Sequence, residues 1–212
     1  MKQSADITLL VDKSGSMASC KAATIEGFNA FIDTQKQNPK PATVSFCQFS
    51  DPSEYFYVFQ NLDLQFCPKL TFENYHPNGS TALLDAMAKI IDETGYRLSR
   101  LSESERPDTV IMVIMTDGEE NSSIEYKGNW EAINEKIAHQ RGKYNWQFFF
   151  IGANQDAIAT AGKMAIPQTH ALNYNSTPEG TKQAYRGLSV ACLASREGYT
   201  KGFADLDLNQ NP

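Results

Sequence analysis

The sequence predicts one α/β domain: a doubly wound, mostly parallel sheet with one antiparallel edge strand and helices on both faces. Apolar runs of strand length alternate along the chain with segments whose apolar residues recur at helical spacing. Strands that are joined through helices cross over right-handedly and pair in parallel. At 212 residues the chain has room for one such domain with a buried core.

The N-terminal part is expected to begin with two buried strands, at 7–11 and 42–49, joined by an amphipathic helix over 19–37. The short aromatic-rich run 55–59 follows a turn and should pair with 42–49 as an antiparallel edge strand. Residues 61–80 show no clear period, so we expect a long crossing loop, a kind of segment that is often functional.

The C-terminal part continues the alternation of strands and helices. Helices are expected at 84–98, 130–137, 155–164 and 178–194. Strands are expected at 109–115, 146–151 and 169–173. The run TVIMVIM at 109–115 has the strongest strand character and should lie at the sheet centre. Thr177-Pro178 is typical of a helix start.

The domain is expected to span residues 1–194. From Ser195 onward the apolar period fades, so residues 195–212 are predicted to be a C-terminal extension that is loosely docked or mobile.

Composition excludes several classes of function. The net charge is −6 and no segment is dense in Lys or Arg, so nucleic acid is not expected as a partner. No run approaches eighteen apolar residues, which predicts no membrane span. The apolar stretch near the N-terminus is too short for a signal-peptide core. The four scattered cysteines lack CxxC spacing and are expected to be reduced core thiols, so a cytoplasmic location is predicted.

Two predicted strands each deliver an aspartate into a glycine-containing turn. Asp12 opens DKSGSM after the first strand, and Asp117 lies in TDG after 109–115. In doubly wound sheets, ligands gather beyond the carboxyl ends of the strands where the strand order reverses. We therefore expect both aspartates at one rim.

Three hydroxyl groups are expected to join these aspartates. The DxSxS spacing adds Ser14 and Ser16, and Thr81 follows the long loop at the predicted start of a helix. Donors that are all oxygens of short side chains suit Mg²⁺ or Mn²⁺, whereas zinc favours His or Cys. Two carboxylates and three hydroxyls would leave one position open, which an incoming carboxylate would suit. Taken alone, DKSGSM could be an ordinary turn.

Further candidates lie near the predicted rim. Asp85 could accept a hydrogen bond behind Thr81, or it could simply favour the helix dipole. Glu119 and the two residues after it are expected to be solvated rim residues that could shape partner choice. Asn154 could cap a helix or contact a partner. Tyr75, in the long loop, is a rim candidate.

These motifs resemble the von Willebrand factor A domains that carry a metal-ion-dependent adhesion site. The resemblance rests on DKSGS, the threonine of NGSTALLDA and the TDGEEN segment, covers about residues 5–194, and looks most like the stand-alone bacterial and bacteriophage members. It implies that Ser14, Ser16 and Thr81 contact the metal, and that Asp12 and Asp117 act largely through bound water. It also implies that the open position takes an Asp or Glu side chain of a partner protein.

Three functions are compatible with these residues. The first is a Mg²⁺-dependent protein-binding module without catalytic residues. The second is a metal-assisted phosphohydrolase, although Ser14 occupies the place where an acid/base near Asp12 would be expected. The third is a subunit that docks onto an ATPase of the chelatase or MoxR type; the chain itself has no P-loop. A serine hydrolase is not indicated, because GxSxG is absent around Ser14 and Ser16.

Overall fold

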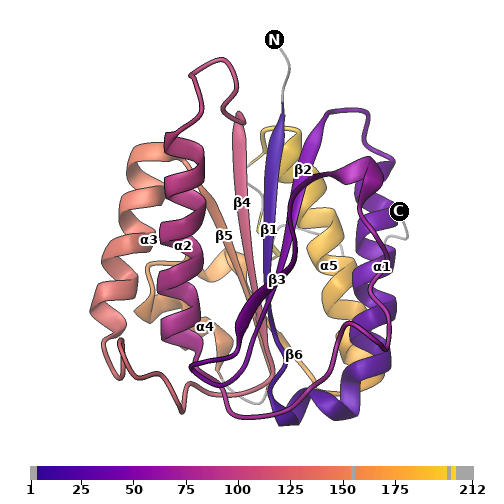
Figure 1. Ribbon diagram of the computed structural model, residues 1–212, viewed down its shortest axis with the longest axis vertical. Coiled ribbons are helices and arrows are strands. Elements are labelled where there is room, and N and C mark those ends of the chain that lie inside the picture. The colour runs from indigo at the N-terminus through magenta and orange to yellow at the C-terminus, as the bar shows by residue number, and fades with distance from the viewer. Residues whose placement is uncertain (1–3, 154–155, 200–201, 204–212) are drawn as a thin grey trace.

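The computed structural model describes residues 4–153, 156–199 and 202–203, and shows a six-stranded sheet between two layers of helices (Figure 1). The strands are β1 (Ala5–Asp12), β2 (Ala42–Phe49), β3 (Tyr55–Asp63), β4 (Thr109–Thr116), β5 (Gln147–Ala153) and β6 (Ala171–Tyr174). Their order is β3-β2-β1-β4-β5-β6. The β2–β3 pairing is antiparallel, and the other pairings are parallel. The predicted fold class is therefore confirmed.

The helices form a layer on each face of the sheet (Figure 1). They are α1 (Lys21–Lys36), α2 (Leu83–Ser99), α3 (Trp130–Tyr144), α4 (Ala157–Lys163) and α5 (Pro178–Arg196), with short 3₁₀ turns η1 (Gly15–Cys20), η2 (Leu64–Phe66) and η3 (Gln168–His170). Ile7 and Leu9 of β1 pack in the core beneath α1 and α5, and Leu10 packs in the core beneath α2 and α3. Burial on both faces explains why β1 reads as a continuous apolar run.

Strand order reverses at β1, which lies between β2 and β4. The chain leaves β1 towards α1 on one face, whereas α2 leads into β4 from the other face (Figure 1). This switch point opens the carboxyl ends of β1 and β4, at the lower edge of the sheet in Figure 1. Asp12 is the last residue of β1, and Asp117 directly follows β4.

The expected elements are present, but many of their boundaries differ, and three of these differences have a clear structural reason. The helix predicted from 19 starts at Lys21, because η1 precedes it. The loop predicted over 61–80 begins later, since β3 continues to Asp63. Asn61 adopts a left-handed φ of 51° where the register of the β2–β3 pairing shifts, so the regular alternation of the strand is interrupted there. At the C-terminus, α5 runs to Arg196, whose guanidinium donates to the carbonyl of Gln35 (2.7 Å).

The predicted extension beyond 194 is described in part. Residues 200–201 and 204–212 lie outside the described residues. Phe203 is buried and packs edge-on against Phe149, with 5.4 Å between ring centroids. All four cysteines are buried free thiols, as predicted. No helix within the described residues combines the length and apolar character that a membrane crossing needs.

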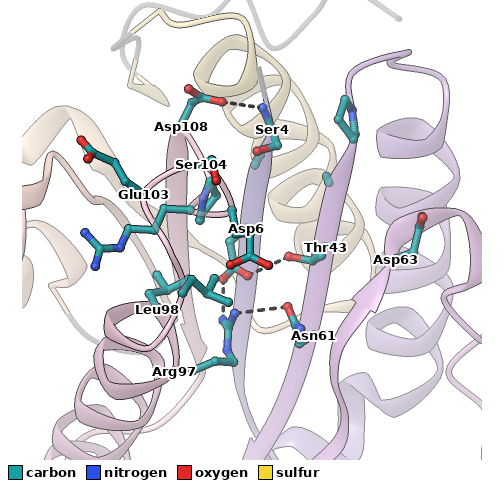
Figure 2. A pocket seen from close by; sticks show the side chains of 17 residues that line it. Ser4, Asp6, Thr43, Asn61, Asp63, Arg97, Leu98, Glu103, Ser104 and Asp108 are labelled. Carbon is teal, nitrogen blue, oxygen red and sulfur yellow. Dashed lines mark hydrogen bonds and ion pairs between the residues drawn. The ribbon is translucent and has the colours of Figure 1, made fainter. Parts of the chain in front are cut away.

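The opposite edge of the sheet holds a cavity of about 650 Å³ with an ion pair at its base (Figure 2). Asp6, only 2% exposed, accepts from Arg97 Nη2 (2.8 Å) and from Thr43 Oγ1 (2.7 Å). Arg97 Nη1 also donates to Asn61 Oδ1 (3.2 Å). These contacts bind the end of α2 to three strands.

This ion pair yields a stability prediction. Arg97→Met leaves the buried Asp6 without its cation, so the free energy of unfolding should fall by about 2–3 kcal/mol in urea denaturation. Arg100→Met is the matched control, because the Arg100 guanidinium lies on the surface over the Tyr96 ring. The control should change stability by less than about 0.5 kcal/mol. Equal losses in the two variants would contradict a specific role for the pair.

Candidate metal centre

The structure places the predicted metal residues close together at the carboxyl edge of the sheet. Ser14 Oγ and Ser16 Oγ lie 3.0 Å apart, and Ser16 Oγ donates to Asp117 Oδ1 at 2.5 Å. Asp12, Ser14 and Asp117 are buried, whereas Ser16 is exposed. The cluster therefore opens to solvent at Ser16.

Thr81 completes the cluster, and Gly118 keeps space open beside it. A Cβ on Gly118 would lie 2.9 Å from Thr81 Oγ1, 3.7 Å from Ser16 Oγ and 3.8 Å from Asp12 Oδ2. One point beside Gly118 is thus within 4 Å of oxygens from two separate chain segments, the DKSGSM turn and the residues that precede α2. Within the described part of the chain, His, Cys, Asp and Glu form no cluster of three or more that could hold a metal. The donor set here is mixed, two carboxylates with three hydroxyls, and it fits a hard divalent cation.

The carboxylate of Asp12 is held on both oxygens by neutral donors. Its Oδ1 accepts from the backbone N–H of Ser14 (2.6 Å), and its Oδ2 accepts from Thr116 Oγ1 (2.6 Å). Burial raises the pKa of Asp12 to about 6, while the hydrogen bonds from Thr116 and Ser14 lower it and the nearby Asp117 raises it slightly. A cation beside these buried carboxylates would offset the cost of their charge.

Tyr75 supports Asp12 from below. It is fully buried, and its hydroxyl donates to the backbone carbonyl of Asp12 (2.7 Å). The prediction that Tyr75 lies on the rim was therefore wrong. The long loop folds back over the core and buries this ring. Burial is tolerated because the Asp12 carbonyl accepts a hydrogen bond from the tyrosine hydroxyl.

The loop that follows Tyr75 is hydrogen-bonded to the DKSGSM turn. Asn78 N–H donates to Lys13 O (2.7 Å), and Lys13 Nζ donates to Asn78 Oδ1 (2.8 Å). Gly15 N–H donates to Gly79 O (3.0 Å). The buried Lys13 ammonium also pairs with Glu54 (2.8 Å). The segments that carry Ser14 and Thr81 are thereby held in one arrangement.

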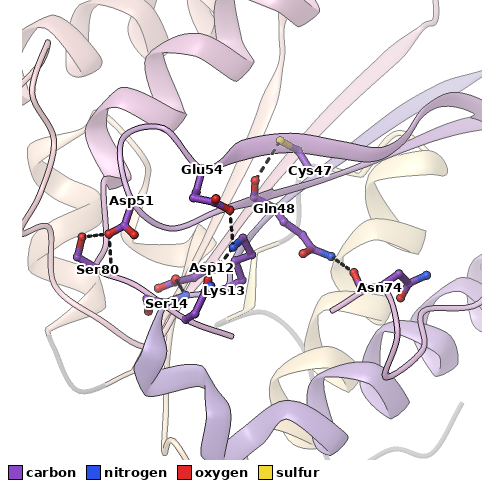
Figure 3. A network of polar contacts seen from close by, with 10 residues as sticks. Asp12, Lys13, Ser14, Cys47, Gln48, Asp51, Glu54, Asn74 and Ser80 are labelled. Carbon is purple, nitrogen blue, oxygen red and sulfur yellow. Dashed lines mark hydrogen bonds and ion pairs between the residues drawn. The ribbon is translucent and has the colours of Figure 1, made fainter. Parts of the chain in front are cut away.

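Asp51 holds the residue that precedes Thr81. Both the N–H and the hydroxyl of Ser80 donate to Asp51 Oδ1, as Figure 3 shows. Gly79 has a φ of +78°, and a Cβ there would collide with the Asp51 carboxylate. Glycine is therefore required at this point of the loop.

Asn121 is exposed, as predicted for a solvated rim residue, and Glu120 is half-buried, but both also make structural contacts that were not predicted. Asn121 Oδ1 accepts from Thr81 N–H (2.9 Å), and Asn121 N–H donates back to Thr81 O (3.1 Å). Glu120 Oε2 accepts from Leu84 N–H (2.9 Å) at the start of α2. The cap of α2 thus comes from a loop that is distant in sequence, so a local capping pattern could not predict it.

Asp85 anchors the segment after Asp117. Its carboxylate accepts from the backbone N–H groups of Ile124 (2.7 Å) and Tyr126 (2.7 Å). Glu119 is exposed, as predicted for a rim residue. Asn154 lies outside the described residues, and the N-cap of α4 is Asp156, whose Oδ1 accepts from Ala159 N–H (3.0 Å).

Ser176, between β6 and α5, is a site residue that the sequence did not indicate. Its hydroxyl donates to Asp117 Oδ2 (3.1 Å). With Ser16 on the other oxygen, Asp117 is held from two sides. Only the pairing of β6 with β5 brings Ser176 to this edge, so no motif spacing could have found it.

The contact beneath Asp12 predicts a difference between two buried tyrosines. Tyr75→Phe leaves the buried Asp12 carbonyl without this donor, and should lower the free energy of unfolding by about 1–2 kcal/mol. Tyr185→Phe removes a hydroxyl that has no hydrogen-bond partner in the described part of the structure. It should change stability by less than about 0.5 kcal/mol. Urea denaturation of both variants checks this, and equal effects would refute the support assigned to Tyr75.

Comparison with known proteins shows which folds and sequences this chain resembles. No family model matches the sequence. A stretch of 129 residues, 59% of this chain, is 30% identical to human integrin alpha-X and covers 11% of that protein. The chain thus spans a small part of this relative.

Solved structures resemble most of the chain. Proximal thread matrix protein 1 (PTMP1) from the mussel byssus superposes with a TM-score of 0.56 at 15% identity, over 89% of this chain and 46% of that one. A form of it with a zinc-occupied MIDAS motif gives 0.53 at 15% identity, with the same coverage. The pilus adhesin SpaC from Lactobacillus rhamnosus GG gives 0.60 at 12% identity, over 90% of this chain and 30% of that one. These likenesses show that the chain has the α/β fold of von Willebrand factor A-like domains.

Proposed function

We propose that this domain is a divalent-cation-dependent protein-binding module. The observation that carries the proposal is the convergence of Ser16, Thr81 and Asp12 oxygens around the space beside Gly118. Ser14, Ser16 and Thr81 would hold the cation directly, and Asp12 and Asp117 would act largely through water. When bound, the cation would offer a coordination position to an Asp or Glu side chain of the partner.

Mg²⁺ or Mn²⁺ is the proposed metal. The candidate donors are hydroxyl and carboxylate oxygens, which hard cations prefer. The zinc-occupied MIDAS motif in a form of PTMP1 supports a divalent cation in this fold. The absence of His and Cys among the five candidate ligands favours the harder ions for this chain.

Binding is better supported than hydrolysis. A phosphohydrolase of the aspartyl-phosphate kind needs a carboxylate that faces the substrate. Asp12 is 0% exposed, and its oxygens are occupied by Ser14 N–H and Thr116 Oγ1. The exposed member of the cluster is Ser16, so a partner would meet hydroxyls first. The likeness to integrin alpha-X and to adhesion and matrix proteins supports a protein partner.

An ATPase of the chelatase or MoxR type is one possible partner within this proposal. The cytoplasmic location and the stand-alone bacterial or phage type stay predictions from the sequence.

Gly118→Ala tests whether the space beside Thr81 holds the cation. The new methyl group would lie 2.9 Å from Thr81 Oγ1, so Mg²⁺ affinity should fall at least about tenfold in isothermal titration. Gly162→Ala in α4 is the control, because a Cβ there meets no atom within 4 Å, and it should bind Mg²⁺ like the parent. If a folded Gly118→Ala variant bound Mg²⁺ with the affinity of the parent, the assignment of the cation to this position would be wrong.

A peptide titration tests the binding function. In ¹⁵N-labelled protein with Mg²⁺, the peptide acetyl-SGDGS-amide should shift the amide resonances of Ser16 and Gly118, because its carboxylate reaches the metal. The matched SGNGS peptide should not, and EDTA should reverse the shifts. Thr81→Ala should abolish them, whereas Ser104→Ala, at the opposite edge in Figure 2, should not. Shifts that persist in EDTA, or that the Asn peptide reproduces, would contradict the proposal.

A further inference from the structure

The segments around the candidate metal centre carry more negative charge than a divalent cation can neutralise. Residues 12–19, 50–54, 74–82 and 117–127 contribute seven carboxylates and two ammonium groups, a net charge of −5. A divalent cation reduces this to −3. An acidic partner residue would therefore approach a site that stays negative around its metal.

Contacts within the structure tie several of these carboxylates to the candidate ligands. Asp51 accepts from Ser80, the neighbour of Thr81, and these hydrogen bonds hold the pKa of the Asp51 carboxyl below its usual range. Glu54 pairs with Lys13, the neighbour of Asp12, and so neutralises the ammonium group nearest the site. Asp51 and Glu54 both belong to the turn between β2 and β3.

In the part of the chain that the structure describes, the side chains of two other carboxylates make no hydrogen bond or ion pair of this kind. Glu119 is the second residue after Asp117, and Glu125 follows in the segment that Asp85 anchors; both residues are exposed. Glu120, between them, is different because it caps α2. Glu119 and Glu125 are thus the negative charges of this segment that an approaching partner would meet, together with the exposed Lys127.

The excess negative charge lies on one side of the candidate metal centre. The segment 117–127 contacts the N-terminal turn of α2 through Glu120 and Asp85. On the other face, α1 begins at Lys21, and the first turn of α5 carries Glu179, with Lys182 directly after it. Lys21 Nζ donates to the Phe72 carbonyl, and Lys182 pairs with Glu26. A partner therefore meets an acidic side near α2 and a balanced side near α1 and α5.

We infer that the partner segment presents a single carboxylate flanked by basic residues, with its basic flank over the β2–β3 turn and the 117–127 segment. This inference rests on the proposed function, because it assigns the partner's carboxylate to the metal. Clustered acids in the partner would add repulsion, whereas Lys or Arg neighbours would be attracted to Glu119 and its surroundings. Exposed charges of this kind alter both association rate and affinity, and salt screens them.

Three peptides that differ only in their flanks test the inference: acetyl-KGDGK-amide, acetyl-SGDGS-amide and acetyl-EGDGE-amide. Titrated into the protein with Mg²⁺ at low salt, they should bind in the order lysine-flanked, serine-flanked, glutamate-flanked, with about a tenfold range in Kd. The range should shrink towards unity at about 0.5 M salt. The KGNGK peptide, which lacks the carboxylate, should show no Mg²⁺-dependent binding.

Two charge-reversal variants test where on the protein surface the basic flank of the peptide binds. Glu119→Lys should reduce the range of Kd among the three peptides severalfold, because it removes negative charge beside Asp117. Glu103→Lys makes the same change in net charge at an exposed position by the opposite edge (Figure 2), and should leave the range unchanged. An equal response of the two variants would overturn the placement of the basic flank.

The outcomes separate this inference from the proposed function. Three peptides that bind with equal Kd, each dependent on Mg²⁺, would overturn the inferred partner chemistry and leave the binding function standing. Failure of every peptide to bind in a Mg²⁺-dependent way would overturn both.

Discussion

The reversal of strand order at β1 is the constraint on which the candidate site depends. Because β2 and β4 flank β1 and their connections lie on opposite faces, the carboxyl end of β1 is left uncovered by either crossover. Asp12 closes the strand there, and Tyr75, Ser14 and Thr116 fix its backbone carbonyl and both carboxylate oxygens. Loops from distant parts of the chain can then assemble around a rigid acceptor.

The residues of the candidate site differ in burial. Asp12 and Asp117 are buried and held by neutral donors, whereas Ser16 faces solvent. Contacts from loop to loop, such as those of Asn121 with Thr81, keep the hydroxyls near the carboxylates. This arrangement suits a cation that is neutralised from behind and approached from the hydroxyl side. In the proposed function, the exposed Glu119 and Glu125 would act on the partner.

Much of the fold and the core of the site could be predicted, because both follow from local pattern. Apolar runs marked the strands, and DxSxS spacing with a second strand-end aspartate indicated Ser14, Ser16 and Asp117. The supporting contacts were not predictable, because they join residues that are far apart in sequence. Asn121 and Glu120 looked like solvated polar residues, and Ser176 like part of an ordinary turn. Tyr75 was misplaced because its loop has no period that reveals burial.

Anomalous scattering from crystals grown with Mn²⁺ tests the central claim most directly. We predict a single strong peak beside Gly118, at a coordination distance of about 2 Å from the hydroxyl oxygens of Ser14, Ser16 and Thr81. Asp12 and Asp117 should be farther from the peak, with water between. A peak bound elsewhere, or no peak at this edge while the hydroxyl cluster is intact, would contradict the account.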